Sequence, residues 1–129
     1  MGIKFIQPEE IAIELSKLLQ DYTTEVTEAI EDEIDKTAKL VLDEVKRTAP
    51  KKTGDYRKGF KIKKQDSKGT VTRIIYQAKK PGLAHLLELG HAKRGGGRVS
   101  ERPHMRPAYD KYVPTMEKNI EEIIKKGGK

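Results

Sequence analysis

Residues 8–47, PEEIAIELSKLLQDYTTEVTEAIEDEIDKTAKLVLDEVKR, carry the pattern that decides the fold. Apolar side chains recur in this stretch at steps of three and four residues, which is the spacing of one face of an α-helix. They are Leu15, Leu19, Tyr22, Val26, Ile30, Ile34, Val41 and Val45, with Ala38 in the one gap. Pro8 with two following glutamates is a favourable helix start, and Ala49-Pro50 is a favourable stop. The pattern predicts a long N-terminal helix over residues 8–48.

An unbroken helix of this length would measure about 60 Å at 1.5 Å per residue, which is too long for a domain of 129 residues. The stretch 22–27 contains three threonines and is the weakest helix former in the run. We therefore expect the helix to bend or break there, or else to reach as an arm onto another subunit. A coiled coil is a third interpretation, but the apolar steps average about 3.75 residues and not 3.5.

Residues 58–80 predict a β-hairpin that follows a turn-rich connector, in which Gly54 suits a positive φ. The residues that alternate with polar neighbours are Phe60 and Ile62 in the first strand and Thr72, Ile74 and Tyr76 in the second. Two strands are marginally stable on their own. We therefore expect them to pack on the long helix and to be joined by a third strand, either near Val99 or from another subunit.

The C-terminal third begins with a short helix, predicted over 83–89 and closed by Gly90. Residues 91–103 contain three consecutive glycines and predict a flexible loop. Pro107 begins a C-terminal helix over 107–125, whose apolar stripe continues through Pro114 and so predicts a kink there. Together these elements predict one α+β domain over residues 1–129, with a long N-terminal helix packed on a small antiparallel sheet and a C-terminal helix.

The composition narrows the classes of protein that fit. Charged residues make up 36% of the chain and aromatic residues 5%, and there is no Trp. The core is therefore aliphatic and thin for the length, which is often compensated by oligomerisation. The absence of cysteine excludes disulfides and thiolate chemistry. No apolar run approaches the ~20 residues of a membrane-spanning helix, so we expect a soluble protein with no membrane partner.

The formal net charge of +7 conceals a segregation of charge along the chain. Residues 1–45 contain 12 acidic and 4 basic residues, whereas residues 46–129 contain 23 basic and 8 acidic residues. Such an asymmetry bears on association and solubility, not on fold. It suits either nucleic acid or a second copy whose acidic end meets this basic end.

The three histidines all lie between residues 84 and 110, and they suggest either a metal site or acid–base catalysis. His85, Glu88, His91 and His104 invite a metal site, because imidazole and carboxylate groups are zinc ligands. Gly90 breaks the helix before His91, however, and the spacing is not that of a His-Glu-x-x-His site. We favour the interpretation that Glu88 pairs with a nearby Lys or Arg while the histidines form local hydrogen bonds. For acid–base catalysis, the sequence does not indicate which group would lie beside a histidine as its partner. We therefore expect no cofactor and no enzymatic activity.

Nucleic-acid binding has more support, from lysines on the first predicted strand and from a basic cluster around the three glycines. The cluster consists of Lys93, Arg94, Arg98 and Arg102. Interleaved aromatic residues and helix-turn-helix or zinc-finger spacing are missing, so only contacts with the phosphate backbone are expected. A solvated basic face explains the same residues equally well. We therefore keep these four residues as a candidate contact with a subunit or with DNA.

Three motifs in a fixed order are more specific than these chemical patterns. They are Ala-Pro-x-x-Thr-Gly at 49–54, Ala-His-x-x-Glu-x-Gly at 84–90 and Arg-Pro-Ala at 106–108. From about residue 10 to residue 125, the chain resembles the small tail-component family of tailed bacteriophages and prophages, the tail-completion or head–tail joining proteins of long-tailed phages. The positions that carry the resemblance are Pro50, Thr53, Gly54, Arg57, His85, Glu88, Gly90, Arg106 and Pro107. The chain departs from the family at His104, where Phe is common.

The resemblance implies a non-enzymatic structural protein of the virion, made in the cytoplasm of the host bacterium, with a curved sheet crossed by the long helix. It implies a ring of identical subunits at the head–tail junction or tail end, beside other phage head or tail proteins. Basic residues lining its lumen would suit non-specific contact with passing DNA. An acidic helix and a basic body suit head-to-tail contacts between subunits. The competing class is a small basic nucleic-acid-binding protein or nuclease of a mobile element.

Overall fold

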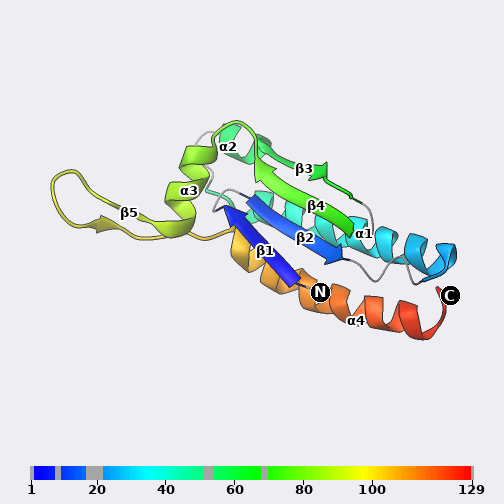
Figure 1. Ribbon diagram of the computed structural model, residues 1–129. Coiled ribbons are helices and arrows are strands. Elements are labelled where there is room, and N and C mark those ends of the chain that lie inside the picture. The colour runs from blue at the N-terminus through cyan, green and yellow to red at the C-terminus, as the bar shows by residue number, and fades with distance from the viewer. Residues whose placement is uncertain (1, 8–9, 17–21, 51–53, 68–69, 129) are drawn as a thin grey trace.

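The computed structural model of the chain describes residues 2–7, 10–16, 22–50, 54–67 and 70–128. A four-stranded antiparallel sheet with the order β1-β2-β4-β3 forms one layer, and helices α1 and α4 lie side by side on one of its faces (Figure 1). The elements are β1 (Gly2–Gln7), β2 (Glu10–Ser16), α1 (Thr24–Thr48), α2 (Asp55–Lys58), β3 (Phe60–Lys64), β4 (Thr70–Gln77), α3 (Pro81–Leu89), β5 (His91–Ala92), β6 (Arg98–Val99) and α4 (Met105–Lys125). The predicted α+β class is confirmed, with a long helix and a C-terminal helix on a small antiparallel sheet.

The first third of the predicted 8–48 helix is wrong. Residues 10–16 form β2, which pairs antiparallel with β4, and α1 begins only at Thr24. Ile11 and Ile13 are both buried in the core, and a repeat of two with β-branched residues is typical of a strand. The apolar spacing of three and four residues that is typical of α1 also extends into the residues before it, and it concealed this two-residue repeat. Residues 8–9 and 17–21, which belong to the same prediction, lie outside the described residues.

Helix α1 begins inside the threonine-rich stretch where an interruption was expected. The Oγ1 atom of Thr23 accepts a hydrogen bond from the backbone N–H of Val26 at 3.2 Å. Because a side-chain acceptor satisfies one of the otherwise unpaired first N–H groups, this stretch starts a helix instead of bending one. The predicted stripe from Val26 to Val45 is buried, and the helix ends at Thr48 as predicted.

The hairpin of β3 and β4 is confirmed, with Phe60 opposite Gln77 and Ile62 opposite Ile75. The sheet is completed by β1 and β2, which come from the N-terminal segment that was predicted as helix. The prediction of a third strand near Val99 is wrong for this sheet, because Val99 pairs with His91 in a separate two-stranded ribbon.

The core lies between the sheet and the two long helices. Helix α4 begins two residues before the predicted Pro107 and continues through Pro114. Its buried residues are Met105, Ala108, Tyr109, Val113, Met116 and Ile120, and they join a cluster that includes Ile11, Ile13, Val71 and Ile75 of the sheet. Pro107 is tolerated in the first turn, where its missing N–H would have no helical partner. Among the described residues, no helix is long and apolar enough to cross a membrane.

A buried arginine ties the sheet to α1. Arg73 of β4 is 2% exposed, and its Nε donates to Oδ1 of Asp35 on α1 at 2.5 Å. Its Nη1 donates to Oδ1 of Asp66 at 2.6 Å. Burial works to lower the pKa of Arg73, but the hydrogen bonds and charges of Asp35 and Asp66 hold that pKa above its usual range. The side chain therefore remains charged, and it is fixed by carboxylates from two sides.

Candidate functional site

Helix α3 ends at the base of a projecting ribbon. Its predicted end at Gly90 is confirmed, because the backbone N–H of Gly90 donates to the carbonyl of Leu86 at 2.7 Å. Gly90 has a φ of 73°, and a Cβ atom there would lie 2.7 Å from the carbonyl oxygen of Val99. Both the positive φ and the close approach of the second strand therefore favour glycine at this position.

Residues 91–102, called the arm below, form a short β-hairpin that projects away from the sheet and the helix pair (Figure 1). His91 pairs with Val99 and Ala92 with Arg98. At the tip, the N–H of Lys93 donates to the carbonyl of Gly97 at 3.0 Å. The segment predicted as a flexible loop over 91–103 therefore contains two short strands, and the glycines between them permit the tight turn.

All four predicted contact residues lie on the arm and are exposed. They are Lys93, Arg94, Arg98 and Arg102, called the arm cations below. Arg98 donates from Nη2 to the carbonyl of Leu89 at 2.6 Å, which fixes its side chain against the end of α3. In the described part of the chain, none of the four forms a salt bridge with a carboxylate. Their charges are therefore available to an external partner.

One buried carboxylate joins the two ends of the arm. Oε1 of Glu88 on α3 accepts hydrogen bonds from the backbone N–H groups of His104 at 2.7 Å and Met105 at 3.0 Å. These groups lie at the start of α4, so Glu88 acts as a cap for that helix across the arm. The N–H of Arg102 adds a bond to the carbonyl of Leu87 at 2.6 Å. The arm therefore leaves and rejoins the body at one fixed point.

His104 completes this anchor. Its Nδ1 lies 2.9 Å from both Oε1 of Glu88 and the carbonyl oxygen of Arg102, and its Nε2 lies 2.7 Å from the hydroxyl of Tyr56. Since Nδ1 faces two acceptors, we assign the neutral ring its proton there, and Nε2 then accepts from the Tyr56 hydroxyl. The rings of Tyr56, Phe60 and His104 meet edge to face, with centroids 5.0–5.7 Å apart.

The anchor shifts the pKa values of two of its members. Burial works to raise the pKa of Glu88, but hydrogen bonds from the His104 side chain and from the backbone of His104 and Met105 lower it below its ordinary value of 4.5. Burial, reinforced by the charge of Glu88, raises the pKa of Tyr56 above its usual range. Glu88 is therefore ionised and the Tyr56 hydroxyl is protonated at neutral pH.

This geometry corrects the predicted environment of Glu88. Its partners are His104 and backbone N–H groups, and not the nearby Lys or Arg that we expected. No group of three or more His, Cys, Asp or Glu residues is placed to hold a metal ion in the part of the chain that the structure describes. His85 is exposed on α3, whereas His104 is buried in the anchor.

The other predicted motif residues surround the connector and the start of α4. Gly54 has a φ of 82° and precedes α2, as its predicted positive φ requires, and Thr53 lies outside the described residues. Pro50 follows the end of α1. Nε and Nη2 of Arg57 are buried and have no hydrogen-bond partner among the described residues. Arg106 and Pro107 are exposed in the first turn of α4.

Two buried polar residues were missed in the sequence, Tyr56 of the anchor and Arg73 of the sheet. Tyr56 was treated as part of a turn. It lies in the short helix α2, four residues before Phe60, which begins β3. Arg73 was not singled out in the sequence, although it lies in register with the core residues Val71 and Ile75. A period-two count starting from Val71 would have marked Arg73 as inward-facing.

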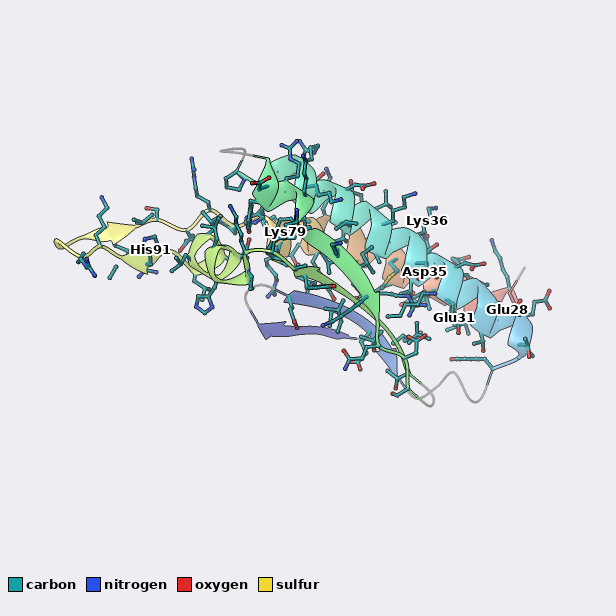
Figure 2. The ribbon with its side chains drawn as sticks, turned by 90° about the horizontal axis from the view of Figure 1, so that it is seen from above. Glu28, Glu31, Asp35, Lys36, Lys79 and His91 are labelled. Carbon is teal, nitrogen blue, oxygen red and sulfur yellow. The ribbon has the colours of Figure 1, made fainter. Side chains whose placement is uncertain are left out.

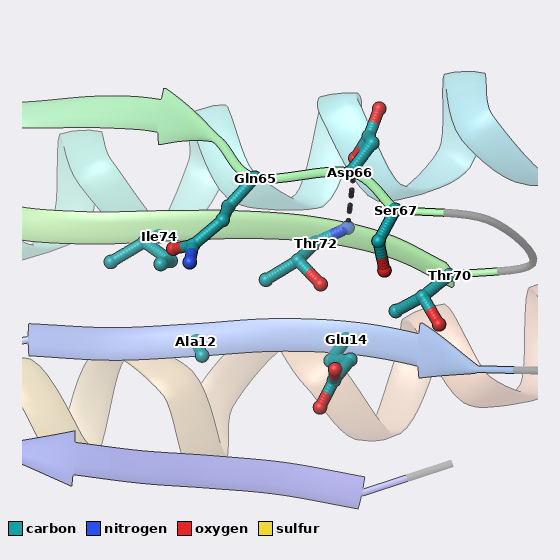
Figure 3. Close-up of a pocket in the computed structure, with 8 residues that line it drawn as sticks. All are labelled: Ala12, Glu14, Gln65, Asp66, Ser67, Thr70, Thr72 and Ile74. Carbon is teal, nitrogen blue, oxygen red and sulfur yellow. Dashed lines mark hydrogen bonds between the residues drawn. The ribbon is translucent and has the colours of Figure 1, made fainter.

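The outer face of the sheet is hollowed beside the β3–β4 turn (Figure 3). The hollow measures about 250 Å³ and is lined by Ala12, Glu14, Gln65, Asp66, Ser67, Thr70, Thr72 and Ile74. The carboxylate of Asp66 is already bound by Arg73 and by the N–H of Thr72, which the dashed line marks. The remaining groups do not form a nucleophile–base pair, so the hollow offers no recognisable catalytic chemistry.

A family model described as "Bacteriophage HK97-gp10, putative tail-component" matches residues 13–90 of the chain. The match covers more than half of the sequence, from within β2 to the glycine that ends α3. It therefore spans α1, the β3–β4 hairpin and the residue that anchors the arm. No curated protein and no solved structure matched the chain.

Proposed function

The chain belongs to the HK97-gp10-like family of bacteriophage tail components, and from this premise we propose that it acts in tail completion or head–tail joining. The observation that carries the proposal is the family match over residues 13–90, which includes α1, the β3–β4 hairpin and Glu88. The family is a structural one, and our proposal assigns no reaction to the protein. Its place is the virion, after assembly in the cytoplasm of the host bacterium.

We further propose that the subunits form a ring. The arm and the N-terminal half of α1 lie at opposite ends of the molecule (Figure 1) and carry opposite charges. Two different, complementary surfaces on one chain favour head-to-tail contacts, and these close into rings when the rotation between subunits permits it. Neighbouring head or tail proteins of the same phage are the remaining partners in this proposal.

A basic lumen fits the same arrangement. Lys61, Lys63 and Lys64 of β3 are exposed on an edge strand of the sheet. Cations of this kind would attract the phosphate backbone of DNA without reading its sequence. Non-specific contact with DNA that passes through the ring is therefore part of the proposal. Tight, salt-sensitive DNA binding by isolated monomers would instead favour the alternative, a nucleic-acid-binding protein or nuclease of a mobile element.

The proposal is tested by deleting the gene from the phage or prophage that encodes it. Electron microscopy of the lysate should show separate heads and tails, or tails with abnormal ends or abnormal length, in place of joined particles. Supplying the wild-type protein from a plasmid should restore joined particles. Normal yields of joined, infectious particles without the gene would refute a role in tail completion or joining.

A further inference from the structure

The arm cations outnumber the acidic residues of the arm. Lys93, Arg94, Arg98 and Arg102 are exposed, and the arm contains one acidic residue, Glu101. No described carboxylate forms a salt bridge with any of the four cations. The arm is therefore a projecting, net positive surface held rigidly at its base by Glu88.

The complementary surface lies on the first half of α1. Residues 24–35 contain six acidic residues and no basic residue. Asp35 is bound to Arg73, and Glu33 accepts a hydrogen bond from Asn119, but three others are exposed at positions that share the outer side of the helix. These three, Glu25, Glu28 and Asp32, are called the acidic face of α1 below. Within the described part of the chain, none of them forms a salt bridge.

These two surfaces cannot meet within one chain. Figure 2 shows Glu28 and Glu31 at one end of the molecule and His91, where the arm begins, toward the other. The helices and the sheet lie between them (Figure 1). The arm of one molecule can therefore reach an acidic face of α1 only on another copy.

Apolar groups accompany the charges on both surfaces. Leu83, Leu86 and Leu89 of α3 are 39%, 41% and 46% exposed at the base of the arm. On the helix layer, Leu40 is 39% exposed in a groove of about 360 Å³ between α1 and α4. Tyr112 and Met116 line the groove with it, and polar residues that include Lys36 and Lys111 line the rest. Each surface thus has an apolar part next to a charged part, which is the usual composition of a protein interface.

The spacing of the two parts also agrees. Along α1, Leu40 and Asp32 are separated by eight residues, or about 12 Å at 1.5 Å per residue. From Leu89 to Arg94 the chain advances five residues, which span at most about 17 Å when extended. Leucines of α3 placed at the α1–α4 groove would therefore bring the arm tip within reach of the acidic face.

We propose that the arm of one subunit binds the acidic face of α1 on a second copy of the chain, with the α3 leucines seated at the α1–α4 groove. This inference rests on the proposed ring and names its subunit contact. The interface is head-to-tail, so each subunit uses its arm toward one neighbour and its acidic face toward the other. DNA is the competing occupant of the arm, and the experiments below separate the two.

Cysteine cross-linking tests the contact directly, because the chain contains no native cysteine. The double variant Arg94→Cys/Asp32→Cys should form a ladder of disulfide-linked multimers under mild oxidation, ending at the subunit number of a closed ring. Either single variant alone should give no ladder, since a disulfide requires two Cα atoms within about 7 Å. The matched control Lys61→Cys/Asp32→Cys pairs the same acidic position with a cation outside the arm, and it should give no ladder.

A charge exchange provides a second test that uses sedimentation of the full chain. Lys93→Glu/Arg94→Glu and Glu28→Lys/Asp32→Lys should each weaken self-association by about tenfold or more, because like charges then face each other. A variant carrying all four changes should recover association. The matched control Lys61→Glu/Lys64→Glu reverses as much charge on β3 and should leave association unchanged. Circular dichroism verifies that every variant is folded.

The outcomes distinguish this contact from the proposed function. Wild-type protein that stays monomeric, or a four-residue exchange that fails to recover association, would overturn the arm–α1 contact. A loss of DNA binding by Lys93→Glu/Arg94→Glu with unchanged association would overturn it in favour of DNA. In each of these cases the gene-deletion experiment still decides separately whether the protein acts in tail completion or joining.

Discussion

Oε1 of Glu88 lies 2.7 Å from the backbone nitrogen of His104 and 2.9 Å from Nδ1 of the same residue. One carboxylate therefore holds both the main chain and the ring of a residue on the far side of the arm. Both side chains are almost completely buried. The position of the arm therefore depends on this pair.

Replacing Glu88 should destabilise the protein strongly. Glu88→Ala leaves the backbone N–H groups of His104 and Met105 without their buried acceptor and removes one of the two acceptors of the His104 Nδ1, so we expect a loss of about 2–4 kcal/mol in the free energy of unfolding. Glu88→Gln keeps one acceptor oxygen but not the charge and should lose about 1–3 kcal/mol. Urea denaturation measures both. Glu101→Gln, on the exposed arm, is the control and should change the free energy by less than about 0.5 kcal/mol. An equally small effect of Glu88→Ala would contradict the capping role.

The anchor should also make stability depend on acid pH. The pKa of Glu88 is lower in the folded protein than its ordinary value of 4.5. Its ionised form therefore contributes fully above about pH 4.5, and the contribution is lost as the pH falls through the folded-state pKa. The difference in unfolding free energy between wild type and Glu88→Gln should accordingly shrink between pH 6 and pH 3. Denaturation curves across this range measure the difference, and a constant value would show that Glu88 does not carry the effect.

Tyr56 and His104 should behave as a coupled pair. Tyr56→Phe leaves the buried Nε2 of His104 without its hydroxyl donor and should destabilise the protein by about 1–2 kcal/mol. His104→Phe removes the acceptor from Tyr56 and the donor from Glu88. The double variant should lose less unfolding free energy than the two single variants together, by about 0.5 kcal/mol or more. The reason is that each single variant already removes the hydrogen bond that the two residues share. Strict additivity in the double-mutant cycle would mean that the Tyr56–His104 bond contributes nothing.

Gly90 should resist substitution, whereas a glycine at the arm tip should not. Gly90→Ala combines a φ of 73° with a Cβ atom 2.7 Å from the carbonyl oxygen of Val99, so we expect a loss of more than about 1 kcal/mol and displacement of the arm. At Gly95 a Cβ atom meets nothing within 4 Å, and its φ is not in the left-handed region. Thermal unfolding of Gly90→Ala and Gly95→Ala compares the two directly. Equal melting temperatures would refute the close approach at Gly90.

The sequence predicted the elements whose periodicity is long and uninterrupted. The stripe of α1 from Val26 to Val45 and that of α4 both lie in the core, and Gly90 ends α3 as expected. The strand β2 was missed because Ile11 and Ile13 lie just before residues that continue the helical steps of α1. Its identity depends on pairing with β4, which is distant in sequence and therefore invisible to a local pattern.

Several residues of the candidate site were singled out in the sequence, but Tyr56 and the contacts of the anchor were not. The basic cluster around the glycines and the positions Glu88 and Gly90 were singled out by composition and by family resemblance. The bond from Glu88 to His104 spans sixteen residues and a projecting hairpin, so no helical or strand spacing could reveal it. Arg73 was missed for a similar reason, since only the packing of β4 under α1 brings Asp35 beside it.

The central claim, that this tail component works through an arm-to-α1 contact between its subunits, is tested most directly by complementation. Phage or prophage lacking the gene is supplied with wild type, Lys93→Glu/Arg94→Glu, or the variant that also carries Glu28→Lys/Asp32→Lys. The yield of joined head–tail particles is then counted by electron microscopy. We predict that the arm variant yields separate heads and tails and that the exchanged variant restores joined particles. Joined particles at wild-type yield with the arm variant alone would contradict the claim.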